Sequence, residues 1–337
     1  MKIFLFVLLA CFSLINGFSQ RADFYVTRSQ IKSDFKNYST AIDDLDIAIQ
    51  MNPANVHSYM LRGIANSELK EFQNAVIDFN KVIRLKPNYS LVYFYRGRAN
   101  LMLDRFKEAE ADYTVYIKNN PYVAYAYFRR GNARSNLKNY NQAIKDFEKT
   151  LILDPDIEEV WYEMAYAKSQ NNQFAEAVKD FDKVIEYFPN EYYAYKNRAL
   201  CKKMLNDFKG ALKDYNIAIA NDSCNSKGYY FRAEIKVSLH DYQGAIVDYS
   251  KAIELNANDI ISYIKRGITK STLDDFLGAI EDFTSAIKVD PKNSESYARR
   301  GFIKHLLQDK EGSCSDFSKA VELGEQNGVE MINQFCK

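Results

Sequence analysis

An exact repeat of 34 residues constrains this chain more than any other feature. A small residue recurs at that interval without insertion or deletion, as Gly63, Gly97, Gly131, Ala165, Ala199, Ala233, Gly267 and Gly301. A fixed period predicts an array of small units, each packed mainly on its neighbours, so the length of 337 residues counts repeats and not globular domains. Nine units follow one another at residues 22–55, 56–89, 90–123, 124–157, 158–191, 192–225, 226–259, 260–293 and 294–327.

Apolar and aromatic residues inside each unit recur at spacings of 3, 4 and 7, which indicate helices. An aromatic residue precedes the small residue by four positions, as Tyr59 precedes Gly63, and the pattern Phe72, Ala75 and Phe79 follows later in the unit. Prolines such as Pro87 stand where one unit ends, because proline cannot continue a helical hydrogen-bond ladder. Each unit therefore predicts two amphipathic helices, in the second unit about 56–70 and 73–85, and the chain as a whole is all-α.

This combination of an aromatic residue, Gly, Ala, a second aromatic residue and Pro resembles the tetratricopeptide repeat over residues 22 to about 327. The resemblance implies a right-handed superhelical solenoid of helix-turn-helix units, with a concave face lined by the first helix of each unit. Departures gather near the ends, where Ser29 replaces the small residue of the first unit and Ser313 replaces Ala in the last. Terminal units of a stack are usually atypical. We expect the tail, residues 325–337, to form a capping helix.

An arginine precedes the small residue in every unit except the fifth, which has Met164, and an aspartate recurs in every second helix. The first complete pairs of this predicted ladder are Arg62 with Asp78, Arg96 with Asp112, and Arg130 with Asp146. A structural ladder is the preferred interpretation, because charged groups packed between helices must be paired. Two pairings fit the spacing equally. If arginine and aspartate pair within a unit, Met164 leaves Asp180 without an arginine; if they pair across the next turn, Met164 leaves Asp146 without one.

Aromatic and apolar residues outside the repeated framework fall on positions that the resemblance places on the concave face. They are Leu91, Phe94, Met102, Tyr125, Phe128, Tyr162, Tyr166, Tyr193 and Tyr230. Such rings suit an extended peptide or a partner helix, since they offer rigid apolar area with a hydroxyl at the edge. Packing between neighbouring first helices is the alternative. The Lys and Asn pair with which some family members grip a C-terminal carboxylate is absent, because Leu200 follows Lys196 by one turn.

Cys314 and Cys336 are the candidate disulfide. The ninth unit should end near Gly324, and a tail that folds back brings the two cysteines level, ten residues up and twelve down. The arrangement also resembles the C-terminal ending of exported bacterial tetratricopeptide proteins; two free thiols are the alternative. Between Cys201 and Cys224 we expect no bond, because about nine residues of helical rise separate them by ~13 Å.

The first 19 residues lie outside the repeats. Met1 and Lys2 precede an apolar run from Ile3 to Ile15, and small residues follow at Gly17 and Ser19, which is typical of a cleaved secretory signal. A membrane anchor is the alternative, and so is a lipidated Cys11, since Leu8 to Cys11 resembles a bacterial lipobox. We expect an exported protein, in the periplasm, associated with the outer membrane or secreted.

Lys plus Arg (45) nearly balances Asp plus Glu (44), which gives no broad positive field for nucleic acid. We expect no enzyme, cofactor or metal, because His57, His240 and His305 belong to distant units and no phosphate loop or nucleophile setting is found. The sequence thus favours a protein-interaction scaffold. The alternatives are a structural subunit of an envelope or secretion assembly and an accessory glycan-binding subunit.

Overall fold

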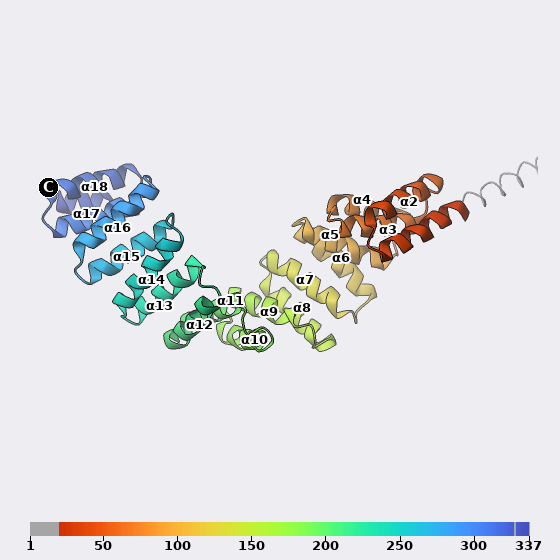
Figure 1. The fold of residues 1–337 in the computed structure, drawn as a ribbon, viewed down its shortest axis with the longest axis horizontal. Coiled ribbons are helices and arrows are strands. Elements are labelled where there is room, and N and C mark those ends of the chain that lie inside the picture. Colours follow the sequence, from red (N-terminus) through yellow and green to blue (C-terminus); the bar gives the residue numbers. More distant parts are fainter. Residues whose placement is uncertain (1–19, 327, 337) are drawn as a thin grey trace, which may run out of the picture. The chain divides into compact units, whose positions relative to one another are not determined.

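The computed structural model describes residues 20–326 and 328–336, and the regular secondary structure in these ranges is α-helical (Figure 1). The all-α class is therefore confirmed. The predicted signal peptide over residues 1–19 and the lipidation candidate Cys11 lie outside the described residues. The chain divides into two compact units, the N-terminal unit up to Asn171 and the C-terminal unit from Asn172 on. The expected superhelix concerns the whole chain and stays a prediction.

The N-terminal unit begins with a helix over residues 20–34. It continues with α2 (Tyr38–Met51), α3 (Val56–Glu68), α4 (Phe72–Leu85), α5 (Ser90–Met102), α6 (Phe106–Asn119), α7 (Ala124–Asn136), α8 (Tyr140–Leu153) and α9 (Glu159–Gln170). From α2 to α9 each helix packs against the next one along the chain, and α5 and α7 also contact each other across the intervening second helix.

The C-terminal unit repeats this order. Its helices are α10 (Phe174–Tyr187), α11 (Tyr192–Met204), α12 (Phe208–Asn221), α13 (Ser226–Ser238), α14 (Tyr242–Leu255), α15 (Ile260–Thr272), α16 (Phe276–Val289), α17 (Ser294–Leu306), α18 (Lys310–Glu322) and α19 (Gly328–Phe335). Gly324, with a φ of 92°, follows the end of α18, and α19 then packs on α18 where a capping helix was predicted. None of the helices described combines the length and the apolar character that a membrane span needs.

A left-handed residue ends the first helix of each pair. These residues are Lys36, Lys70, Asp104, Lys138, Asn172, Asn206, His240, Asp274 and Gln308, all with φ between 55° and 65°. At the first helix α3, the amide of Glu71 donates to the carbonyl of Asn66 at 2.8 Å, a bond that closes a helix end of this type. His240 thus occupies the left-handed position that ends α13, which accounts for its place in the fold.

The recurring small residue lets the two helices of a pair approach closely. A Cβ atom added at Gly131 would lie 2.5 Å from Cε1 of Phe147, and one at Gly63 would lie 2.5 Å from Cε1 of Phe79. Both phenylalanines are fully buried in α8 and α4. The repeated aromatic residues of the second helices thus fill the space that the small residues leave.

The predicted ladder pairs within units. Arg130 binds Asp146 with two nitrogens, Nε to Oδ2 at 3.0 Å and Nη2 to Oδ1 at 2.8 Å, and the other pairs have the same bidentate geometry. Asp146 thus keeps an arginine although Met164 interrupts the series, which excludes the pairing across the next turn. The aspartates are buried and the arginines partly buried.

Each ladder aspartate that pairs with an arginine also receives a second donor, from the residue one turn after that arginine. Asn66 donates to Asp78 at 3.3 Å and Asn100 to Asp112 at 3.1 Å, while Lys202, Lys236, Lys270 and Lys304 take this place in the C-terminal unit. Burial raises the pKa of Asp112 against the opposing effect of Arg96. The extra donor compensates part of the cost of burying the carboxylate.

The third arginine nitrogen, Nη1, reaches the second helix of the preceding repeat. Arg62 donates to Asp46 at 2.5 Å, Arg96 to Asn80 at 2.6 Å and Arg198 to Asp182 at 2.5 Å. At the other arginines the acceptors are Thr114, Asn216, Ser250 and Thr284. The arginine therefore joins consecutive repeats as well as the two helices of one repeat.

Candidate functional site

The residues predicted to line an open face fall into two groups in the N-terminal unit. Leu91, Met102, Tyr125 and Tyr166 are exposed on the first helices α5, α7 and α9. Phe94 and Tyr162 are partly buried. Only part of the predicted set is thus open to a partner.

Phe128 was wrongly assigned to the open face. It is 5% exposed and belongs to a core cluster with Ile144, Phe147 and Met164. Its ring centroid lies 6.1 Å from that of Phe147 on the second helix α8. The side chain therefore packs the two helices of its repeat together.

Phe94 likewise packs against the second helix of its repeat, and it also contacts the next first helix. Its ring meets Tyr113 edge-on at 5.7 Å and lies 5.1 Å from Tyr116 and 6.2 Å from Tyr125, counted between centroids. Tyr125 continues this chain of rings to Phe128 at 5.9 Å. Packing inside the stack thus accounts for Phe94 and Phe128: each contacts the second helix of its own repeat and also the first helix of the next repeat.

In the C-terminal unit the two predicted residues differ in the same way. Tyr193 on α11 is 52% exposed, and Nζ of Lys196 stands 5.2 Å from its ring centroid. Tyr230 on α13 lies 6.0 Å from Tyr249 and is partly buried, and burial raises its pKa to about 12. Tyr193 remains a surface candidate, whereas Tyr230 contributes mainly to packing.

A polar group on α7 escaped the sequence analysis. The guanidinium of Arg129 lies 4.6 Å from the ring centroid of Tyr125 and 5.4 Å from that of Phe128, and it donates to the Tyr125 hydroxyl. Nε of Arg129 and Oδ1 of Asn132 are buried without a hydrogen-bond partner in the described residues. Burial raises the pKa of Glu163 on the neighbouring α9, and Arg129 opposes the shift.

These three polar residues could have been found from their register. Arg129 and Glu163 are separated by one period of 34, and Asn132 stands one helical turn after Arg129. They therefore share the face of the first helices that also carries Tyr125 and Tyr166. The aromatic residues of this face had been predicted from the sequence, and the polar residues beside them had not.

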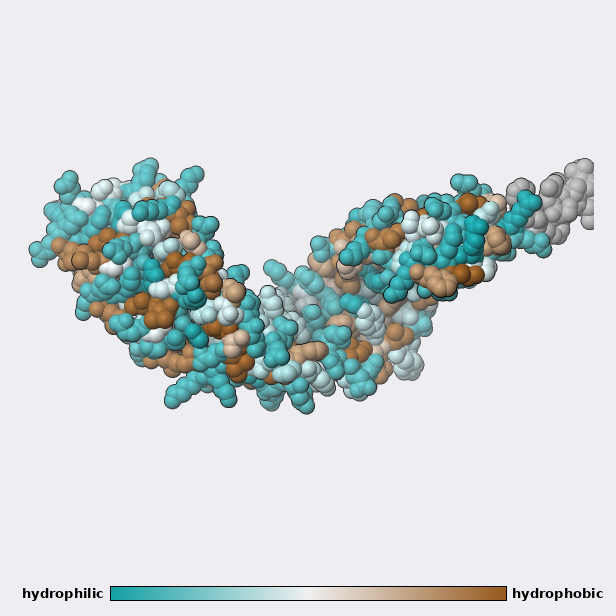
Figure 2. Space-filling view, in the orientation of Figure 1, coloured by the Kyte–Doolittle hydropathy of each residue, from teal (hydrophilic) through white to brown (hydrophobic). Residues whose placement is uncertain are grey.

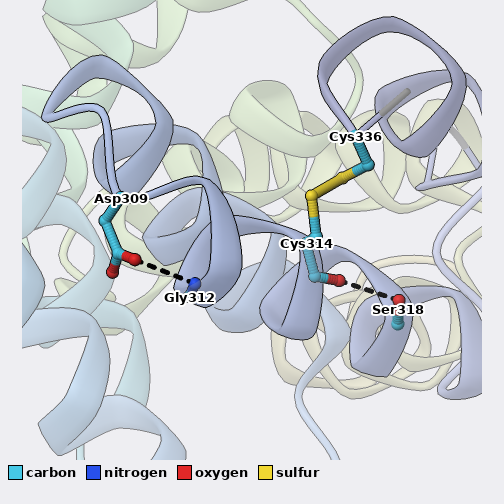
Figure 3. The surroundings of a disulfide bond; sticks show 5 residues. All are labelled: Asp309, Gly312, Cys314, Ser318 and Cys336. Atoms are coloured by element: carbon cyan, nitrogen blue, oxygen red, sulfur yellow. Dashed lines mark hydrogen bonds between the residues drawn. A yellow bond between two sulfur atoms is a disulfide. The ribbon is translucent and has the colours of Figure 1, made fainter.

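Cys314 and Cys336 form a disulfide with Cα atoms 5.6 Å apart, as predicted, and the bond fastens α19 to α18 (Figure 3). Figure 3 also shows Asp309 capping the start of α18 through the amide of Gly312, at 2.9 Å. The thiols of Cys201 and Cys224 are free; burial raises the pKa of Cys201 to about 11.

The three histidines have separate local contacts. His57 lies 3.1 Å from Gln30, counted between Nε2 atoms, and Nδ1 of His240 lies 3.0 Å from the hydroxyl of Tyr242. His305 packs on Phe335 at 4.4 Å between ring centroids. Within the residues described, no three His, Cys, Asp or Glu side chains gather as a set of metal ligands.

Exposed apolar side chains are spread over both units. In the view of Figure 2 they form small patches interrupted by hydrophilic residues. Monomeric proteins commonly expose apolar residues in this scattered way. Particular residues, and not overall hydrophobicity, therefore distinguish a binding face on this surface.

Family models of the tetratricopeptide repeat match four segments, residues 56–89, 124–157, 162–226 and 226–259. No curated protein matches the sequence.

A solved tetratricopeptide repeat protein from Parabacteroides merdae is 21% identical, with a TM-score of 0.52 over 74% of this chain and 99% of that one. That likeness shows the fold alone. MamA from Desulfovibrio magneticus is 23% identical, with a TM-score of 0.48 over 49% of this chain and 94% of its own. YrrB, described as a tetratricopeptide repeat protein with an unusual peptide-binding site, is 18% identical, with a TM-score of 0.48 over 56% of this chain and 97% of its own.

The matched segments coincide with helix pairs that carry the aromatic residues, small residues and arginine–aspartate pairs described above. Repeats of this type stack into extended surfaces that bind other proteins. The chain is a tetratricopeptide repeat protein, a scaffold for protein interactions.

Proposed function

We propose that this protein is an exported, non-catalytic scaffold that holds an extended peptide segment of its partner on the first-helix face of the N-terminal unit. One observation carries the proposal: Nε of Arg129 and Oδ1 of Asn132 are buried and lack partners among the described residues. A buried polar atom without a partner costs roughly 1–3 kcal/mol. A peptide group offers a carbonyl to the first atom and an N–H to the second, so a peptide that displaces the side chains covering these atoms recovers both costs.

The surroundings suit a peptide side chain beside that backbone group. Tyr125 on α7 and Tyr166 on α9 are exposed, and Leu91 on α5 adds an aliphatic contact. Tyrosine supplies rigid contact area at a low cost in conformational entropy. The guanidinium of Arg129 is held over Tyr125, so little of its freedom is left to lose on binding.

The test replaces Arg129 by Met and Asn132 by Leu, which keeps volume and removes the two polar atoms. The matched control is Arg84→Met with Asn119→Leu, two exposed residues on the second helices α4 and α6. Each variant is panned against a displayed library of random linear peptides and used to recover partners from an envelope extract.

We expect the wild type and the control to select the same peptides and the Arg129 and Asn132 variant to bind them about tenfold more weakly, a loss of about 1.4 kcal/mol. Circular dichroism verifies that all three proteins are folded. Equal binding by the variant and the control would refute the proposed site. It would direct attention to other faces, as a structural subunit of an assembly would use.

Two observations support export. The sequence from Met1 to Ser19 has the order of a secretory signal, and Cys314 and Cys336 form a disulfide, a bond that persists in oxidising compartments. Fractionation of the source cells with mass analysis of the mature N-terminus tests this part of the proposal. A chain that starts at Met1 in the cytosol would contradict it, and a mass increase at Cys11 would indicate lipidation.

A further inference from the structure

A cavity of about 660 Å³ lies in the C-terminal unit between α15, α17 and the segment that leads into α19. Its apolar walls come from Ile268 on α15, from Phe302, Ile303 and Leu306 on α17, and from Met331 on α19. Sites that bind small molecules or large side chains have volumes of roughly 300–1,000 Å³. None of these residues belongs to the peptide face proposed for the N-terminal unit.

The last helix, which supplies Met331 to the lining, is shorter than the first helices of the repeats. The first helix α17 has 13 residues, whereas α19 has 8, so α19 is only ~12 Å long against ~20 Å. The cap therefore covers part of the surface on which a full first helix would pack. Figure 1 shows α17 and α18 side by side at the C-terminal end of the chain.

The disulfide and Phe335 fix the position of this cap. The ring of Phe335 lies 4.4 Å from His305, 5.9 Å from Phe317 and 6.2 Å from Phe302, counted between centroids. The next residue, Cys336, is bonded to Cys314 on α18 (Figure 3). The ring contacts of Phe335 and the disulfide of Cys336 thus fix α19, and with it Met331, beside the cavity.

The polar side chains of the rim already have partners. Arg299 binds Glu295 at 2.7 Å, Glu325 accepts from the hydroxyl of Ser294 at 3.0 Å, and the hydroxyl of Thr272 donates to the Ile268 carbonyl at 3.0 Å. An occupant is therefore not needed to satisfy them. The charged lining residues are two carboxylates and one guanidinium, which leaves one negative charge in excess.

We propose that this cavity binds a bulky aromatic side chain of a protein partner, flanked in the partner's sequence by a basic residue that is attracted to the excess negative charge of the rim. The apolar walls take the ring, and Glu325, which accepts from a neutral hydroxyl while Glu295 pairs with Arg299, favours the basic neighbour. The cap α19 completes the site, so its attachment through Cys336 is part of the binding geometry.

The probe is the peptide acetyl-Lys-Trp-Lys-amide, compared with acetyl-Glu-Trp-Glu-amide and acetyl-Lys-Gly-Lys-amide. Methyl-labelled methionine provides the readout, because the chain has seven methionines and Met331 lines the cavity. We expect the Met331 signal to move in a saturable titration with the first peptide. Reversing its charges should weaken binding about fivefold, as removal of an exposed ion pair does, and removing the ring should abolish the shift.

Thr272→Trp fills the cavity from its exposed edge and should abolish binding. Ser238→Trp is the matched control, because Ser238 is exposed and stands one period earlier on α13. Cys336→Ser releases the cap and should weaken binding about tenfold.

Three results would overturn the proposal: no shift of Met331 in the wild type, equal affinity for the acidic and basic peptides, or unchanged binding in Thr272→Trp. Unchanged binding in Cys336→Ser would exclude α19 as a wall. Because the site lies outside the N-terminal unit, loss of the Arg129 and Asn132 face leaves these results unaffected, and the two proposals fail separately.

Discussion

Replacing a ladder arginine by methionine should cost different amounts at two neighbouring repeats. Methionine is the natural residue at this position in the fifth repeat, Met164, so the change is compatible with the packing of such a unit. Arg96→Met leaves the side chain of Asp112, which is 4% exposed, with Asn100 as its remaining donor. Arg130→Met leaves Asp146 with a second guanidinium, since Nη1 of Arg134 lies 2.8 Å from Oδ2.

The magnitudes follow from these remaining partners. Removing one partner of a buried ion pair costs roughly 3–5 kcal/mol, and we take about 3 kcal/mol for Arg96→Met because the arginine is partly exposed. Asp146 keeps a charge-assisted partner, so Arg130→Met should cost about 1.5 kcal/mol. The difference of about 1.5 kcal/mol corresponds to about a tenfold difference in the equilibrium constant for opening.

Amide hydrogen exchange of α6 and α8 measures this local opening, which is preferable to a global midpoint because repeat arrays can open unit by unit. The loss in Arg96→Met should shrink at a pH of about 4, because burial already raises the pKa of Asp112 and a protonated carboxyl needs no cation. Equal losses in the two variants would refute the reasoning, and so would a loss that does not change with pH.

Three further predictions concern other parts of the fold. Gly131→Ala places a Cβ 2.5 Å from Phe147, so overpacking of about 1–3 kcal/mol should outweigh the gain of about 1 kcal/mol in helix propensity and lower the thermal midpoint; a raised midpoint would contradict this. Cys336→Ser opens a link to Cys314 that spans 22 residues and should destabilise the docked cap by about 3 kcal/mol, seen as fast amide exchange confined to α19. Burial raises the pKa of Tyr230 to about 12, above about 10 in the unfolded chain, so its contribution to stability is complete below pH ~10 and is lost as pH rises towards ~12; Tyr230→Phe should therefore lose less stability than the wild type in that window.

The repeat made the helical pairs and their limits predictable. The helices α3 and α4 end within about two residues of the predicted limits, because the left-handed residue Lys70 and the residues after Leu85 stop them. The pairing of the ladder was not predictable, since Asp78 is level with both Arg62 and Arg96 in a stack of hairpins. The pairing depends on which nitrogen of each arginine faces which neighbouring helix, and the repeat spacing does not determine that orientation.

The aromatic set was predicted with mixed success for a related reason. Leu91 and Tyr125 occupy one register of the first helix and are exposed, whereas Phe94 and Phe128 lie three residues further on and turn towards the second helices. Residues that the sequence pattern assigns to one helix face therefore lie in two environments, one exposed to solvent and one packed against the second helices. The cavity beside Met331 was not predicted, because one of its walls comes from α19, which lies outside the repeated pattern.

The link from each ladder arginine to the preceding repeat has a consequence for ionic strength. Arg62 and Arg198 reach carboxylates, Asp46 and Asp182, which are 47% and 55% exposed, while the other arginines reach neutral amides or hydroxyls. Added salt screens exposed ion pairs and leaves neutral hydrogen bonds almost unaffected. The contacts between consecutive repeats that Arg62 and Arg198 form, one in each unit, should therefore weaken in concentrated salt. The corresponding contacts of the other arginines should keep their strength.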